Sequence, residues 1–310
     1  MLATKPVSAT ELCEALRQGR RFDTRALNRI LAIDAARGLL EVQAATPWPT
    51  IAAELRPGDA RAAAVRTTMT TVGESIERNA AGPDGLPAIG HVASLTLVTP
   101  AGEIQRVSRN RNPELFALAA GGQGLFGILY SVTLRIETLA RAVERAAAPE
   151  RMVLRPGSRA WDTVEVLLPP QSLDAFMRET DERCSDWRVP LQSIELRRTQ
   201  REEDSFLRWA CSDYAEVKLA LAQPDVLGAA VRATQLRREL IDAAIRAGGR
   251  FSIATTDATR EQTEACYPQL RQFLAQKRRY DPDERLLNAW YVRQRGLFTR
   301  PGCEVRWAAN

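Results

Sequence analysis

The sequence predicts an α+β protein built from two units that differ in their secondary structure. In the N-terminal half, short apolar runs with alternating side chains predict β-hairpins, and short helices lie between them. From about residue 150 onward, amphipathic helices alternate with strands, which is typical of an antiparallel sheet with helices on one face. We therefore expect one domain at residues 1–150, completed by a C-terminal return at 280–310, and a second domain at 151–279.

Two hairpins dominate the predicted N-terminal unit. Residues 30–33 and 39–44 have the pattern of strands joined at Gly38, because glycine readily takes the positive φ of a tight turn. Residues 92–98 and 104–107 form the second pair, with a Pro-Ala-Gly turn between them. We predict that residues 24–136 form one domain with two small β-sheets.

The second unit is expected to hold an antiparallel sheet backed by helices. Apolar residues at helical spacing predict helices at 172–182, 227–247 and 259–279, the last with a break or kink at Pro268. Each of these helices is apolar on one side, so each needs a sheet or another helix to cover it. The strands are predicted at 164–168, 194–198, 215–222 and 251–254.

Composition excludes several classes of protein. Arginine and lysine exceed aspartate and glutamate by five charges, but they are interleaved with acidic residues, so we expect no nucleic-acid partner. The five cysteines form no CxxC pair and His91 is the only histidine, which argues against a metal centre or a catalytic Ser-His pair. No apolar run is long enough for a bilayer and no apolar leader begins the chain, so we expect a cytoplasmic protein without a membrane partner.

Three segments carry a resemblance to a known family. The first is LNRILAID (residues 27–34) with its hairpin partner, the second is TVGESIERNAAG (residues 71–82) before the strand at 92–98, and the third runs from PELF to GGQGLFGI (residues 113–128). In this order and spacing they resemble the vanillyl-alcohol-oxidase and p-cresol-methylhydroxylase (PCMH) superfamily of FAD enzymes, especially sugar and lactone oxidases. Further similarity at residues 204–207, 266–269 and 277–290 extends the resemblance over nearly the whole chain.

This resemblance implies a PCMH-type FAD-binding domain followed by an antiparallel-sheet cap domain that binds substrate. An FAD pyrophosphate is held by converging backbone N–H groups, and glycine permits that close approach. Gly73, Asn79, Gly82, Gly124 and Gly127 are expected to line one shared groove. The full set of residues implied for cofactor binding is Gly73, Glu74, Ser75, Asn79, Gly82, Gly124, Gly127 and Ile128.

The chain departs from the family pattern in its phosphate-binding segments. Relatives have a strand and a Gly-rich loop between the first helix and Leu27, where this chain has only Arg-Arg-Phe-Asp at residues 20–23. Glu74 stands where the family has a second glycine, so a carboxylate would face the diphosphate unless Arg20, Arg21 or Arg78 offsets its charge. The FAD domain is therefore predicted to be truncated, and its affinity for FAD is predicted to be reduced.

Two functional interpretations follow from these features. The first is an FAD-dependent oxidoreductase that acts on a small polar substrate, with Glu165 and Arg197 as the polar catalytic residues near the flavin. The second is a flavin-free descendant of the same fold, either a non-redox enzyme (an isomerase, cyclase or lyase) or a binding protein. Fold alone does not separate them, because function resides in the site.

Overall fold

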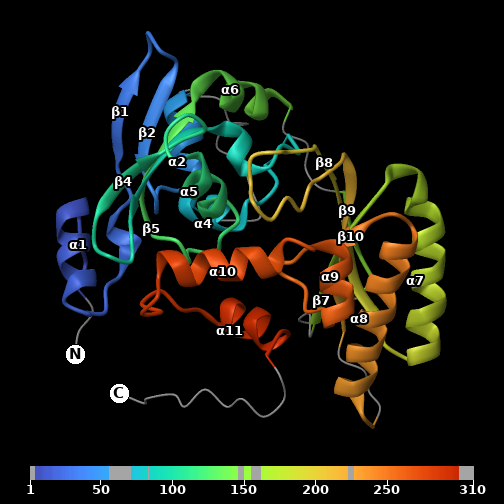
Figure 1. The fold of residues 1–310 in the computed structure, drawn as a ribbon. Coiled ribbons are helices and arrows are strands. Elements are labelled where there is room, and N and C mark those ends of the chain that lie inside the picture. Colours follow the sequence, from blue (N-terminus) through green and yellow to red (C-terminus); the bar gives the residue numbers. More distant parts are fainter. Residues whose placement is uncertain are drawn as a thin grey trace.

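The computed structural model describes residues 4–55, 71–82, 84–145, 150–154, 162–222 and 227–299 (Figure 1). It contains two five-stranded sheets, one in each half of the chain, with helices around them. Neighbouring strands pair antiparallel in both sheets. The predicted α+β class with an antiparallel second sheet is confirmed.

The first sheet is continuous, so the prediction of two small sheets in residues 24–136 is wrong. Its strand order is β1-β2-β5-β3-β4. The central strand β5 pairs with both predicted hairpins, and Val132 lies opposite Val42 on one side and Leu95 on the other. The strands are β1 (Ile30–Asp34), β2 (Leu39–Gln43), β3 (Val92–Val98), β4 (Ile104–Val107) and β5 (Ile128–Arg135).

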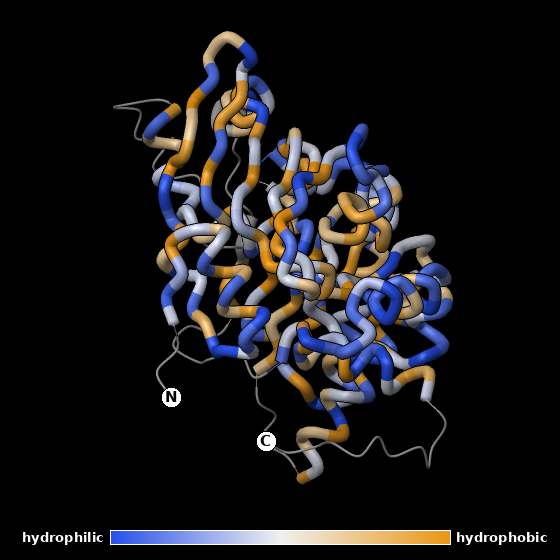
Figure 2. Tube along the Cα trace, turned by 60° about the vertical axis from the view of Figure 1, so that its left-hand side comes forward, coloured by the Kyte–Doolittle hydropathy of each residue, from blue (hydrophilic) through white to orange (hydrophobic). Residues whose placement is uncertain are grey.

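The β1–β2 hairpin projects beyond the rest of this unit (Figures 1 and 2). Its turn contains Gly38 at φ +64°, as the sequence predicts. Strand β1 lies at the edge of the sheet, and its Leu31 and Ile33 side chains are exposed.

Local capping explains where the helices of the first unit begin and end. Ser8 caps the first helix by accepting a hydrogen bond from the Glu11 N–H group. Thr71 caps the N-terminus of α4 in the same way, and Asn79 ends that helix in the left-handed conformation. The sequence analysis did not predict α4 or α6. The helices are α1 (Ala9–Arg17), α2 (Trp48–Leu55), α4 (Val72–Arg78), α5 (Pro113–Ala119) and α6 (Ile136–Arg145).

The second sheet has one apolar face and one charged face. Val164, Val217 and Leu219 are fully buried in the main core, which they share with Leu236 and Leu240 of helix α8 (Ala229–Arg246). Helix α7 (Leu173–Trp187) packs against α8, so both lie on the outer side of the sheet (Figure 1). The strand order is β10 (Arg250–Phe251), β7 (Asp162–Leu168), β9 (Tyr214–Leu221), β8 (Leu191–Thr199) and β6 (Glu150–Val153).

The helix predicted at 259–279 is two helices, α9 (Arg260–Cys266) and α10 (Leu270–Tyr280), separated at Pro268 as expected. Helix α10 packs against the first unit, because Phe273 meets Phe126 edge-on with 5.0 Å between ring centroids. The sequence analysis assigned residues 151–279 to the second domain, but helix α10, at the end of that range, contacts the first unit.

A buried ion pair fixes the C-terminal end of α10. Lys277 donates a hydrogen bond from Nζ to the Leu125 carbonyl oxygen at 2.9 Å and also bonds the Asp281 carboxylate. Both charged side chains are almost completely buried. Asp281 also accepts from the N–H groups of Arg285 and Leu286, so it orders the turn that leads to helix α11 (Ala289–Gly296).

Candidate functional site

A cavity of about 300 Å³ lies between the two sheets. The first unit contributes the end of α4 and the turn after α5, and the second unit contributes the charged face of strands β7, β8 and β9. Segments 205–209 and 252–255 complete the wall. The lining residues are Arg78, Ala80, Ala81, Gly121, Gln123, Glu165, Glu195, Arg197, Ser205, Leu207, Trp209, Glu216, Lys218, Ser252, Ile253, Ala254 and Thr255.

Strand register brings five ionisable side chains together on this face. Lys218 lies opposite Glu165 of one neighbouring strand and Glu195 of the other. Arg197 lies opposite Glu216 and donates from Nε and Nη2 to the Glu195 Oε1 atom at 2.9 and 2.5 Å. Directly opposed residues in a sheet are close enough to interact, so these side chains form one charged cluster.

The cluster includes both residues that the sequence analysis selected for catalysis, Glu165 and Arg197. The analysis missed Glu195, Glu216 and Lys218. Their sequence signal is the spacing of two residues between Glu195 and Arg197 and between Glu216 and Lys218, which places each pair on one face of its strand.

Glu216 is the most perturbed carboxyl group of this cluster. Burial raises its pKa to about 7, and the negative charge of Glu165 adds to the rise, while Arg197 opposes it. The hydroxyl group of Thr199 donates a hydrogen bond to Glu216 Oε2 at 3.0 Å. A carboxyl group with this pKa exchanges protons readily near neutral pH, as a general acid or base must.

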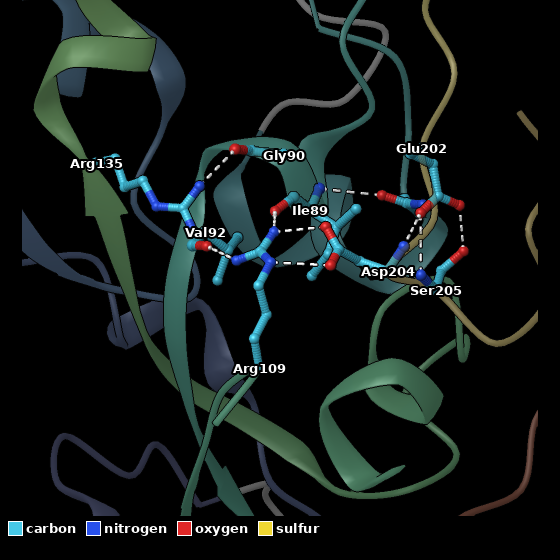
Figure 3. Close-up of polar contacts among 9 residues, drawn as sticks. Ile89, Gly90, Val92, Arg109, Arg135, Glu202, Asp204 and Ser205 are labelled. Atoms are coloured by element: carbon cyan, nitrogen blue, oxygen red, sulfur yellow. Dashed lines mark hydrogen bonds and ion pairs between the residues drawn. The ribbon is translucent and has the colours of Figure 1, made fainter. Parts of the chain in front are cut away.

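An ion pair fastens the segment after β8 onto the first unit (Figure 3). Arg109 donates from Nε and Nη2 to the Asp204 carboxylate at 2.8 and 2.6 Å. The same guanidinium donates to the carbonyl oxygens of Val92 and Ile89 at 2.6 and 3.0 Å. Such a bidentate, charge-assisted pair fixes orientation as well as position.

Glu202 stabilises the turn that presents this segment to the cavity (Figure 3). Its Oε2 atom accepts from the backbone N–H groups of Asp204 and Ser205, each at 2.9 Å. Further along, Trp209 donates from Nε1 to the Asn79 carbonyl oxygen at 2.9 Å. We call residues 200–213 the crossing segment, because they carry Ser205, Leu207 and Trp209 from the second sheet to the cavity wall.

Three of the predicted cofactor residues, Gly73, Glu74 and Ser75, lie in the first turn of α4. The Gly73 N–H group donates to the Ala44 carbonyl oxygen at 2.7 Å, and the Ser75 N–H group donates to the Thr71 carbonyl oxygen at 3.1 Å. A Cβ atom at Gly73 would lie only 2.8 Å from the Ala44 oxygen, so glycine is needed here for packing against the chain itself. These N–H groups therefore serve the protein's own backbone.

Glu74 lies close to a cation on its own helix. Its Oε1 atom is 3.8 Å from Arg78 Nη2, and both side chains are partly exposed. Arg78 is one of the three arginines proposed above to offset this carboxylate. Its neighbour Glu77 has its pKa raised to about 7 by burial and by the charge of Glu74. A second carboxyl group thus lies in this helix, on the side that approaches Gly124.

The remaining predicted cofactor residues are not among those that line the cavity. Asn79 accepts from the Ile89 N–H group through Oδ1 at 3.0 Å, while its buried Nδ2 atom has no hydrogen-bond partner. Gly82 packs beside His91, Gly124 beside Glu77, and Gly127 beside Val98. Ile128 begins β5 and packs against α1. Their sequence neighbours Ala80, Ala81, Gly121 and Gln123 are the residues that reach the cavity.

The connection between α1 and β1 is short and compact. Phe22 forms an isolated bridge with Thr4, and residues 24–26 form one 3₁₀ turn capped by the Asp23 side chain. The backbone of this connector is therefore held by the bridge to Thr4 and by one short 3₁₀ turn.

Within the described ranges, no group of three or more His, Cys, Asp or Glu side chains is placed to hold a metal ion. In the same part of the chain, no helix combines the length and apolar character needed to cross a membrane.

The α+β fold, with its cavity between the two units, fits the PCMH-type architecture that the sequence predicts. Comparison with known proteins agrees: residues 9–108 match the family model of an FAD binding domain. Among 207 matching chains of solved structures is BBE-like 1 of Physcomitrella patens, with a TM-score of 0.62, 11% identity, and coverage of 92% of this chain and 89% of that one. No curated protein matches the chain. The match over residues 9–108 and the shared fold support the resemblance to the vanillyl-alcohol-oxidase and PCMH superfamily that the sequence shows.

Proposed function

We propose that this protein is an FAD-dependent oxidoreductase whose small polar substrate binds in the cavity between the two sheets. One observation carries the proposal. The cavity joins the end of α4 and the turn at Gly121 and Gln123, both within segments that resemble the family, to a strand face rich in ionisable side chains. Enclosed sites with a few convergent polar groups and perturbed pKa values are typical of active sites.

The two ends of an FAD molecule fit this chain differently. A cavity of about 300 Å³ is large enough for the flavin ring or for a small substrate, and Arg78 and Gln123 supply polar groups at its edge. The diphosphate has less support, because the N–H groups of Gly73 and Ser75 already donate to backbone oxygens. We therefore assign Arg78, Ala80, Ala81, Gly121 and Gln123 to the ring end of the cofactor.

The protein's own residues would handle the substrate and its proton. A bound flavin supplies the redox chemistry of this class. Glu216 would take up the proton that the substrate loses, and Arg197, held by Glu195, would lie opposite Glu216 and favour its ionised form. Glu165 would act on Glu216, because its negative charge helps to keep that proton affinity high.

FAD is expected to bind, but with lower affinity than in a protein whose phosphate-binding loop offers free backbone N–H groups. Glu74 is expected to be one cause of the lower affinity. Its negative charge opposes that of the diphosphate. Replacing Glu74 by glutamine or by glycine should tighten binding by about tenfold, equivalent to about 1.4 kcal/mol. The glutamine variant isolates the charge, because glycine also lowers helix stability by about 1 kcal/mol.

The measurement is a titration of the apo-protein with FAD, followed by flavin absorbance, with Glu264→Gln on helix α9 as a surface control. If the wild-type protein purifies yellow with one flavin per chain and the Glu74 variants change nothing, the argument about the phosphate segments is wrong. If no variant binds flavin, the oxidoreductase proposal fails.

A flavin-free function of the same cavity is the second candidate. It is favoured by the compact α1–β1 connector. It is also favoured by the N–H groups of Gly73 and Ser75 in α4, which already donate to backbone oxygens of the protein. In that case Glu216 and its neighbours would serve a non-redox enzyme (an isomerase, cyclase or lyase) or a binding protein. Absence of flavin binding in the titration above selects this candidate.

A further inference from the structure

We propose that the cavity selects a small cationic ligand, a protonated amine, whose ammonium group lies between Glu165 and Glu216. The inference rests on the proposed function only in taking this cavity as the substrate site. It names the chemical class of that substrate.

The balance of charge on the strand face leads to this class. Three carboxylates from the second sheet, those of Glu165, Glu195 and Glu216, face two cations, those of Arg197 and Lys218. Arg197 is committed to Glu195 by two hydrogen bonds. Lys218 lies between Glu165 and Glu195 on the neighbouring strands, so among the sheet residues that line the cavity the three carboxylates outnumber the two cations.

On the opposite wall, Arg78 is the charged residue among those that the structure describes, and its guanidinium is 3.8 Å from the Glu74 carboxylate on the same helix. The crossing segment contributes Ser205, Leu207 and Trp209 to the wall, and the segment after β10 contributes Ser252 to Thr255, all uncharged. Each described cation of the lining therefore lies beside a carboxylate, and an anionic ligand would have to displace that carboxylate in order to pair with it.

Burial makes an ionised Glu216 costly. Glu216 is only 7% exposed, and Arg197, the cation opposite it, already donates two hydrogen bonds to Glu195, so the ionised carboxylate is disfavoured at this position. In the free protein the raised pKa of Glu216, about 7, lets a proton neutralise the charge part of the time. A bound ammonium group would replace that proton, ionise Glu216 and pair with it.

The rest of the wall suits the carbon skeleton of such an amine. Trp209 is held by its hydrogen bond to the Asn79 carbonyl oxygen, and Leu207 and Ile253 lie in the same wall. An indole beside an ammonium group adds cation–π attraction. The volume of about 300 Å³ is at the small end of ligand sites, which limits the ligand to a small amine.

The test is calorimetry on the apo-protein with three probes of nearly equal size: propylamine, 1-propanol and propionate. At pH 7 propylamine should bind at least about tenfold more tightly than the other two, because a charge-assisted hydrogen bond is worth about 1.5–3 kcal/mol. Measured in two buffers of different ionisation enthalpy, its binding should release about half a proton, as a carboxyl group with a pKa of about 7 requires. Affinity should therefore rise with pH through 7.

Two variants separate this role from a general effect on folding. Glu216→Gln, which can still accept from Thr199, should weaken propylamine binding at least about tenfold and abolish proton release. Glu165→Gln should weaken binding too, whereas Glu264→Gln on the exposed part of α9 should change neither quantity; thermal unfolding checks that all are folded.

Tighter binding of propionate, equal binding of all three probes, or an unchanged Glu216→Gln protein would overturn the proposal, as would no binding of any probe. Because no flavin is present, these outcomes are independent of the FAD titration. A protein that binds FAD but not propylamine refutes only the amine assignment, and one that binds propylamine but not FAD refutes only the oxidoreductase.

Discussion

Replacing Lys277 by methionine is expected to lower the free energy of unfolding by about 3–5 kcal/mol. The substitution leaves the Asp281 carboxylate almost fully buried without its cation, and it leaves the Leu125 carbonyl oxygen without its donor. Methionine has a similar length, so the loss of charge rather than the loss of volume dominates. Denaturant-induced unfolding measures this difference in unfolding free energy, provided that both proteins show the same dependence of free energy on denaturant concentration.

The same helix offers a matched control. Arg279 also forms an ion pair, with Glu114, but both side chains are largely exposed, so Arg279→Met should cost less than about 1 kcal/mol. If both methionine variants lose the same amount of unfolding free energy, the buried ion pair stabilises the protein no more than the exposed one.

Removing the Arg109 side chain is expected to loosen the crossing segment without unfolding the sheets. Arg109→Ala deletes both hydrogen bonds to Asp204 and also removes the donors to the Val92 and Ile89 carbonyl oxygens. Hydrogen bonds of this charged type contribute about 1.5–3 kcal/mol, so local opening should become about 10- to 100-fold more frequent. Hydrogen exchange at the Phe206 and Glu202 amides, which donate to Ala117 and Ala210, reports it.

Arg111→Ala is the control, because Arg111 is exposed and lies only two residues away. If the amides of Phe206 and Glu202 keep their protection in Arg109→Ala, the ion pair does not hold the segment in place. A ligand of the cavity should also bind more weakly to the Arg109 variant, since Trp209 and Leu207 lie on the loosened segment.

Local sequence signals predicted most of the elements but not how they pair. Alternating apolar residues and Gly38 identified the β1–β2 hairpin. The merging of two hairpins into one sheet was missed, because it depends on β5 binding both of them from a distance along the chain. Helix α4 was missed since its seven residues include Gly73, whose close contact with Ala44 only the folded chain reveals.

Only part of the candidate site could be predicted from the sequence, for a similar reason. Glu165 and Arg197 were selected through family resemblance, whereas Glu195, Glu216 and Lys218 look like ordinary exposed strand charges in the sequence. Only the register of β7, β8 and β9 aligns them, and register depends on which strands become neighbours. A fully buried Lys277 was equally unforeseeable, because lysine is almost always exposed unless it is paired.

The contact between α10 and the first unit has a consequence for synthesis on the ribosome. Domains usually fold in order as they emerge, the N-terminal one first. Here the Phe126 ring and the Leu125 carbonyl oxygen obtain their partners from Phe273 and Lys277, about 150 residues later in the chain. The N-terminal unit can therefore complete its core only after residue 277 has left the exit tunnel. A nascent chain released at residue 150 would expose that aromatic surface to chaperones and proteases.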